Sequence, residues 1–189
     1  RNNEWKNNET LFLTDVISSP NSARLNLYVT ERYIIKANNE SNEKLKKEFL
    51  NKAVYYGEQS LKIHSKFAYT YLRLGFAYFY LLNYQKTADL WIQAYKLEPT
   101  DPETKKWTEY LSTFLYIEGN GYFEQNNIDE AFRYYIKSTE LNSRNIEAWY
   151  NLGLIYYRKN DTASAGKAWK NVKYLDPNHP FKQKEYFFH

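Results

Sequence analysis

A spacing of residues around three glycines constrains the fold of this chain more than any other feature. Gly119 and Gly153 lie 34 residues apart, and large and small residues surround both at matching offsets. Around Gly153 the set is Trp149, Leu152, Tyr156, Ala165, Trp169, Val172 and Pro177. The same offsets give Leu115, Glu118, Tyr122, Ala131, Tyr135, Ser138 and Ser143 around Gly119, and Tyr71, Leu74, Tyr78, Thr87, Trp91, Ala94 and Pro99 around Gly75. A unit this short cannot bury its apolar residues alone, so neighbouring units must stack and share a core.

This pattern resembles the tetratricopeptide repeat (TPR), a unit of about 34 residues in which two helices pack antiparallel. The resemblance is nearly complete over residues 146–179, strong over 66–179 and weak over 22–65. The glycine and the small residue twelve positions after it allow the two helices to approach closely. The resemblance implies an all-α fold, a right-handed α-α superhelix (TPR solenoid) of about four helix pairs, with one extended helix and a C-terminal capping segment.

The repeat offsets and the helix-start signals divide the chain into segments. We expect a degenerate helix pair whose first helix runs from Ser19-Pro20 to about Ala37 and whose second runs from Glu43 to Ile63. Before it, Leu11, Phe12, Leu13, Val16 and Ile17 are expected to dock an N-terminal arm on this pair. The predicted segments are an arm at 1–21, the pair at 22–65, repeats at 66–101, 102–145 and 146–179, and a cap at 180–189.

The second clear repeat is longer than the others. Gly75 and Gly119 are 44 residues apart, and Thr100 to Glu103 form a helix-start signal, so one long helix is predicted from about Pro102 to Gln125. Its apolar stripe is expected to follow Trp107, Leu111, Phe114 and Glu118. We predict that the N-terminal helices of the same chain cover Trp107, with cover by a partner protein as the alternative.

Few residues suit catalysis or metal binding. The sequence has no cysteine, and the three histidines are too far apart to form a spaced ligand set. It has no glycine-rich phosphate loop and no nucleophile elbow, so we expect no enzymatic activity, no metal and no cofactor. A net charge of +4, with acidic and basic residues mixed, does not indicate nucleic-acid binding. The longest apolar run, Phe76 to Leu82, is too short to cross a bilayer, which needs about 20 residues.

The family resemblance implies a binding groove lined by the first helix of each repeat. Its residues lie at fixed offsets from the motif glycine, and they are rich in aromatic anchors suited to a helix or an extended peptide. The predicted partner-binding residues are Tyr69, Leu72, Arg73, Phe76, Phe79, Tyr116, Asn120, Phe123, Tyr150, Asn151, Leu154, Tyr157, Arg158 and, on the long helix, Trp107. Phe76, Tyr116 and Tyr150 occupy matching offsets and are expected to form one continuous surface.

The expected function is therefore that of a non-enzymatic scaffold that binds a peptide or helix of a partner protein. Residues that clamp a C-terminal carboxylate in a subclass of the family are replaced here, for example by Leu72, Phe76 and Glu147, which disfavours that ligand. Two alternatives remain: the aromatics pack on one another, leaving little groove, or the chain is an extracytoplasmic accessory protein that holds a small ligand for a membrane transporter. The sequence also leaves self-association open.

The start of the sequence bears on location. The chain begins at Arg1 and contains no methionine, so we expect a processed or trimmed product. Frequent Asn, Lys and Tyr are expected of an AT-rich bacterial genome. A periplasmic or membrane-tethered extracytoplasmic location in a bacterium is the expectation, with a cytoplasmic location as the alternative.

Overall fold

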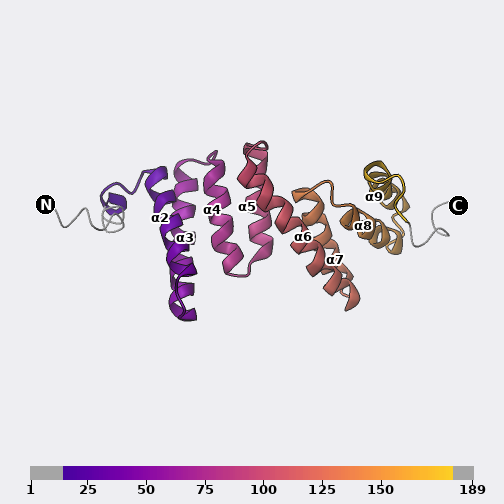
Figure 1. Ribbon diagram of the computed structural model, residues 1–189, viewed down its shortest axis with the longest axis horizontal. Helices are drawn as coiled ribbons and strands as arrows, with labels where there is room; N and C mark the ends of the chain where they lie inside the picture. Colours follow the sequence, from indigo (N-terminus) through magenta and orange to yellow (C-terminus); the bar gives the residue numbers. More distant parts are fainter. Residues whose placement is uncertain (1–14, 181–189) are drawn as a thin grey trace. The chain divides into compact units, whose positions relative to one another are not determined.

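The computed structural model describes residues 15–180 of the chain. Over that range all regular structure is helical and no strand is present (Figure 1). The long helices are α2 (Ala23–Asn38), α3 (Glu43–Ile63), α4 (Ala68–Tyr80), α5 (Tyr84–Leu97), α6 (Pro102–Glu124), α7 (Ile128–Leu141), α8 (Ile146–Arg158) and α9 (Thr162–Leu175). The all-α helix-pair fold expected from the repeat pattern is therefore confirmed.

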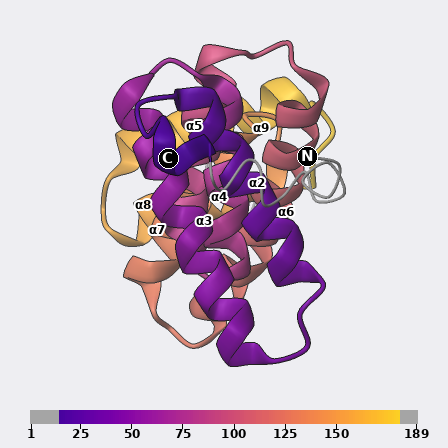
Figure 2. The same ribbon diagram turned by 90° about the vertical axis from the view of Figure 1, so that its left-hand side faces the viewer.

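The chain divides into two compact units, Arg1–Thr108 and Glu109–His189, and the division falls inside α6. In the first unit α2 packs on α3, α3 on α4, and α4 on α5, and α2 also contacts α4. Figure 2 shows α2 and α3 as a hairpin joined by a short loop. In the second unit α7 packs on α8, and α8 packs on α9.

Short polar side chains begin the second helix of each pair. Asn42, Asn83, Asn127 and Asp161 each accept hydrogen bonds from backbone N–H groups in the first turn of the following helix. Such caps satisfy N–H groups that have no partner within the helix. The polar residues between the apolar runs therefore determine where these helices begin.

In three of these helix pairs, the residue just before the capping residue adopts the left-handed backbone conformation. Leu82, Asn126 and Asn160 have φ angles of 61°, 59° and 59°, and each lies seven positions after a motif glycine. Asparagine tolerates this conformation, whereas leucine adopts it at a cost. The same turn recurs in three helix pairs, so these pairs share one backbone conformation at this position. Leu82 adopts this conformation although a leucine side chain disfavours it.

Each motif glycine accommodates an aromatic ring of the following helix. A Cβ atom built on Gly75 would lie 2.1 Å from Nε1 of Trp91, and one built on Gly153 would lie 1.9 Å from Nε1 of Trp169. The indole N–H of Trp91 donates to the carbonyl of Leu72 at 3.0 Å, three residues before the glycine. The glycine therefore lets the second helix place its large ring directly against the first helix.

One of two departures from the repeat pattern has a local structural reason. Thr87 stands where alanine is usual, and its hydroxyl donates to the carbonyl of Asn83 at 3.0 Å, with the carbonyl of Gly75 at 3.3 Å, so this buried polar group is satisfied. Ser143 stands where proline is usual, and its backbone carbonyl accepts the indole N–H of Trp149 at 2.9 Å. A proline has the same carbonyl, so this contact does not explain the serine.

The long helix α6 begins at Pro102 as predicted and ends at Glu124, one residue before the predicted end. The predicted stripe is displaced, however: Trp107, Phe114 and Glu118 are only half-buried, although Leu111 is fully buried. The most buried face instead comprises Thr104, Thr108, Leu111, Ser112 and Leu115. Small residues contribute to this face because they permit close packing of helices. A prediction based only on large apolar residues does not include them.

Two terminal predictions lie wholly or partly outside the described residues. These are the docking of Leu11, Phe12 and Leu13 and the cap at residues 180–189, of which only Pro180 is described. Within the described part, Val16 is buried and Ile17 is exposed. Among the described helices, none is both long and apolar enough to span a membrane.

Candidate binding site

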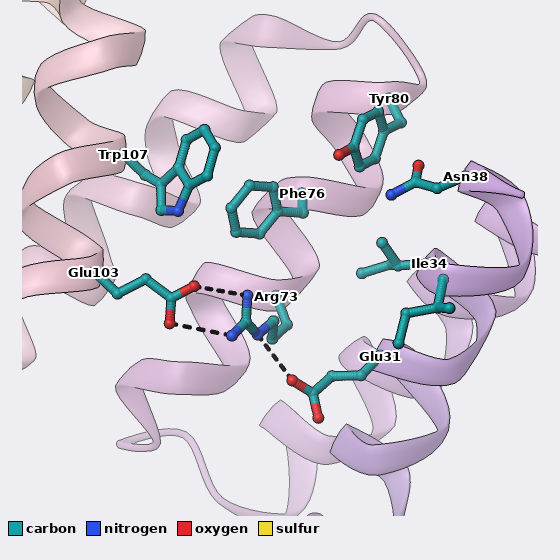
Figure 3. Close-up of a pocket in the computed structure, with 9 residues that line it drawn as sticks. Glu31, Ile34, Asn38, Arg73, Phe76, Tyr80, Glu103 and Trp107 are labelled. Carbon is teal, nitrogen blue, oxygen red and sulfur yellow. Dashed lines mark hydrogen bonds and ion pairs between the residues drawn. The ribbon is translucent and has the colours of Figure 1, made fainter.

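A cavity of about 330 Å³ lies in the first unit, between the first helices of successive helix pairs. Helices α2 and α4 form two of its walls, and the first turns of α6 form the third (Figure 3). The lining residues are Glu31, Ile34, Ile35, Asn38, Arg73, Phe76, Tyr80, Glu103 and Trp107. The cavity is open to solvent rather than enclosed.

One end of the cavity is charged and centres on Arg73. Its Nη1 and Nη2 donate to the two carboxylate oxygens of Glu103 at 3.0 and 3.1 Å, in a bidentate pair. Its Nε lies 2.9 Å from Oε1 of Glu31, which is an ion-pair distance but without hydrogen-bond geometry. Nη2 also donates to the Tyr69 hydroxyl, which in turn donates to Oε1 of Glu31 at 2.8 Å. Arg73 thus ties α2, α4 and α6 together (Figure 3).

These contacts keep Arg73 charged. Burial disfavours the guanidinium cation, but the hydrogen bond with Tyr69 and the nearby carboxylates outweigh that effect and raise the pKa of Arg73. The guanidinium also lies 4.3 Å from the centre of the Tyr69 ring, an additional cation–π contact. Its side chain is 19% exposed, so solvent screens the ion pairs only in part.

The middle of the cavity is apolar and aromatic. Phe76 meets Trp107 edge-on with ring centres 4.9 Å apart, and it meets Trp91 in the same way at 5.0 Å. Ile34 faces them from α2 (Figure 3). The ring of Trp107 contacts Phe76 of α4 and Trp91 of α5, so residues of the same chain cover part of it. Cover by the helices of the N-terminal pair remains a prediction.

The predicted binding residues of the first unit differ in accessibility. Tyr69, Arg73, Phe76 and Trp107 line the cavity or belong to its charged network. Leu72 is fully buried, so its prediction as a binding residue is wrong, because a fully enclosed side chain offers no surface to a partner. Phe79 stacks on Trp91 and contacts the rings of Tyr80 and Tyr84.

The sequence reasoning missed the α2 wall and Glu103. Glu31, Ile34, Ile35 and Asn38 lie in the degenerate first pair, where no glycine motif sets the offsets of the groove positions. The helical spacing of Ile34 and Asn38, four residues apart, was the available signal, but it does not distinguish a groove face from a core face.

In the second unit, polar groups connect α6, α7 and α8. The Tyr135 hydroxyl donates to Oδ1 of Asn120 at 2.7 Å, and Nδ2 of Asn151 donates to the same oxygen at 3.0 Å. Burial raises the pKa of Tyr135 to about 12, so its hydroxyl remains a donor at neutral pH. Tyr116 lies beside Tyr135 with ring centres 6.1 Å apart.

The other predicted residues of the second unit range from buried to exposed. Tyr150 is 8% exposed, and Leu154 is half-buried. The ring of Tyr157 lies 6.0 Å from that of Trp169. Arg158 is exposed, with its guanidinium 4.6 Å from the centre of the Phe123 ring. Phe76 belongs to the first unit, whereas Tyr116 and Tyr150 belong to the second, so a continuous surface through all three remains a prediction.

The chemistry of the cavity suits binding. Within residues 15–180 there is no group of histidine, aspartate and glutamate side chains placed to hold a metal ion. The cavity instead combines an apolar middle, an ion-paired end and amide and phenol groups at the other end, from Asn38 and Tyr80 (Figure 3). These features define a helical-repeat protein with an open cavity on the first helices of its pairs.

Comparison with known protein families identifies the type of repeat. Residues 119–160 match the family described as TPR repeat, and residues 146–179 match the family described as tetratricopeptide repeat. These matches show that residues 119–179 contain tetratricopeptide repeats, as the sequence pattern predicted.

The individual proteins that are similar to this chain either match only part of it or share few identical residues with it. A stretch of 96 residues, 51% of the chain, is 31% identical to the human protein O-mannosyl-transferase TMTC1, and it spans only 10% of that protein. Among solved structures, MamA is similar at 19% identity and a TM-score of 0.42, over 88% of this chain and 85% of that one. A thermophilic TPR protein of Thermus thermophilus is similar at 20% identity and a TM-score of 0.49, over 81% and 69%.

Proposed function

We propose that this protein is a non-enzymatic scaffold that binds a peptide or helical segment of a partner protein. The observation that carries the proposal is the open cavity on the first helices α2, α4 and α6, with an apolar middle and a polar group at each end. Trp107, which is half-buried, and Tyr80, which is 37% exposed, offer ring surface to a partner at a low cost in side-chain entropy. A partner side chain of ordinary size would fit a volume of about 330 Å³.

The openness of the cavity favours a peptide over a small ligand. Small-molecule sites bury most of the surface of their ligand, which an open cavity at the lower end of their volume range does poorly. A peptide needs only to insert one or two side chains while the rest of it lies along the helices. The alternative function, in an extracytoplasmic accessory protein that holds a small ligand for a transporter, is therefore the weaker one. A periplasmic or membrane-tethered location remains part of the proposal.

The second unit is proposed to add contacts of its own. Asn120 and Asn151 present amide groups near Tyr135, and the exposed Arg158 stacks on Phe123. Amide and guanidinium groups beside aromatic rings suit the backbone and side chains of a peptide. We propose Tyr116, Tyr150, Leu154 and Tyr157 as the apolar part of that surface.

Substitution of an exposed cavity residue tests the proposal. Ile35 is 45% exposed and lines the cavity, so Ile35→Lys places a positive charge in the binding surface with little effect on the core. Peptides selected on the purified chain from a random dodecapeptide display library are expected to bind this variant at least about tenfold more weakly, because the new ammonium group must be desolvated. Titration of labelled peptides, followed by fluorescence anisotropy, measures the change.

The matched control is Leu45→Lys. Leu45 is 40% exposed and lies on α3, outside the cavity lining, so this variant is expected to bind as the unmodified chain does. Equal binding by both variants, or no enrichment of any peptide, would contradict the proposed function.

A further inference from the structure

The cavity contains more negative than positive charge. Its lining includes two carboxylates, Glu31 and Glu103, and one cation, Arg73, so these formal charges sum to −1. The whole chain, by contrast, has a net charge of +4. The cavity is therefore an acidic site on a basic protein, and its local potential favours a cationic group over an anionic one.

Both terminal nitrogens of Arg73 already donate hydrogen bonds within the chain. Nη1 and Nη2 hold Glu103, Nη2 also holds Tyr69, and Nε lies at ion-pair distance from Glu31. An anionic side chain of a partner would have to displace one of these carboxylates to reach the guanidinium. Arg73 is thus a structural cation that connects the walls of the cavity rather than a receptor for an acid.

The two carboxylates differ in what they can still accept. Both oxygens of Glu103 are used by the bidentate pair with Arg73. Glu31 uses Oε1 for both Tyr69 and Arg73, and within residues 15–180 its Oε2 accepts no hydrogen bond. Because its Oε2 has no hydrogen-bond donor in that range, Glu31 is the better acceptor for an incoming donor, although its side chain is less exposed than that of Glu103, at 29% against 40%.

The apolar middle of the cavity completes the fit. Ile34 on one side, and Phe76 and Trp107 on the other, can contact an aliphatic chain that leads to the charged end (Figure 3). Lysine and arginine combine an aliphatic stem with a cationic head, and they bury the stem while the head remains in a polar environment. Aromatic rings beside the path add a favourable field for the cation.

We propose that this cavity binds a lysine or arginine side chain of the partner segment, with the cationic head at Glu31 and the stem between Ile34 and Phe76. The proposal rests on the proposed function and specifies the chemistry of the partner. The partner segment is basic at this position and apolar beside it, whereas acidic segments are rejected by the uncompensated negative charge.

Peptide selection on matched variants tests this assignment. A random dodecapeptide library is selected in parallel on the unmodified chain, on Glu31→Gln and on Glu48→Gln. Glu31→Gln removes one charge at constant shape and leaves the Arg73–Glu103 pair in place. Glu48→Gln makes the same charge change at an exposed position of α3, away from the cavity lining. The unmodified chain and Glu48→Gln are expected to enrich peptides with one shared lysine or arginine next to apolar residues, and Glu31→Gln is expected to lose that preference.

A selected peptide then provides a test that does not depend on the stability of a variant. Replacing its shared lysine or arginine with norleucine keeps an apolar chain and removes the charge. For a partly exposed pair we expect about fivefold weaker binding to the unmodified chain and no further loss on Glu31→Gln. Replacement with glutamate is expected to weaken binding more than norleucine does.

The outcomes separate the two levels of the proposal. Enriched peptides without a shared basic position, or a basic preference that survives Glu31→Gln, would overturn the assignment of a cationic side chain and leave the scaffold function standing. If no peptide binds the unmodified chain more tightly than it binds Ile35→Lys, the scaffold function itself fails.

Discussion

Replacement of Gly153 with alanine is expected to lower the free energy of unfolding by about 3 kcal/mol, since overpacking of a tight contact costs this much. The new Cβ atom would lie 1.9 Å from Nε1 of Trp169, so the indole or the helix must move. That movement would also disturb the hydrogen bond from the indole N–H to the carbonyl of Tyr150, now 3.3 Å long. Urea unfolding followed by circular dichroism measures the loss.

Gly166 provides the matched control in the same helix pair. No atom outside its own helix backbone and chain neighbours lies within 4 Å of a Cβ atom built there. Gly166→Ala should therefore stabilise the protein by about 0.5–1 kcal/mol, the ordinary gain from alanine in a helix. Equal stability of the two alanine variants would show that the contact between glycine and indole does not limit the packing of α8 on α9.

Trp107→Ala is expected to destabilise the first unit by about 2 kcal/mol, less than for a fully buried tryptophan because the side chain is only half-buried. The substitution removes the edge-on contact with Phe76 at 4.9 Å and the contact with Trp91 at 6.1 Å. It also enlarges the cavity, so selected peptides should bind more weakly. Thermal unfolding and peptide titration measure the two effects separately.

Trp107→Phe distinguishes ring packing from mere volume. This variant keeps an aromatic ring against Phe76, and we expect it to retain more than half of the stability lost with alanine. If Trp107→Ala changes neither stability nor peptide binding, the first turns of α6 are a tolerated extension, and the cavity wall they form has no role.

The sequence predicted the structure well where it contains a recognisable motif. Gly75, Gly119 and Gly153 set the positions of the paired helices, and the signal at Thr100 to Glu103 correctly began the long helix at Pro102. Both kinds of signal arise from local geometry: the close approach of two helices, and the capping of a helix end.

Other features depended on contacts that no local pattern contains. The buried face of α6 includes Thr104, Thr108 and Ser112, which a search for large apolar residues passes over. Glu31 contacts Tyr69 and Arg73 across more than 35 positions of the chain, and no repeat offset connects them. Leu72 occupies a groove offset of the family, yet the structure buries it completely. The candidate site therefore required tertiary contacts to define it.

The indole N–H resonance of Trp107 offers the most direct test of the central claim that the cavity of the first unit binds a partner segment. Trp107 lines the cavity, whereas Trp149 and Trp169 belong to the second unit and donate to the backbone carbonyls of Ser143 and Tyr150. In nitrogen–proton correlation spectra, a selected peptide is predicted to shift the Trp107 resonance in a saturable way, with the affinity found by anisotropy. An unchanged Trp107 resonance at peptide saturation would contradict the claim.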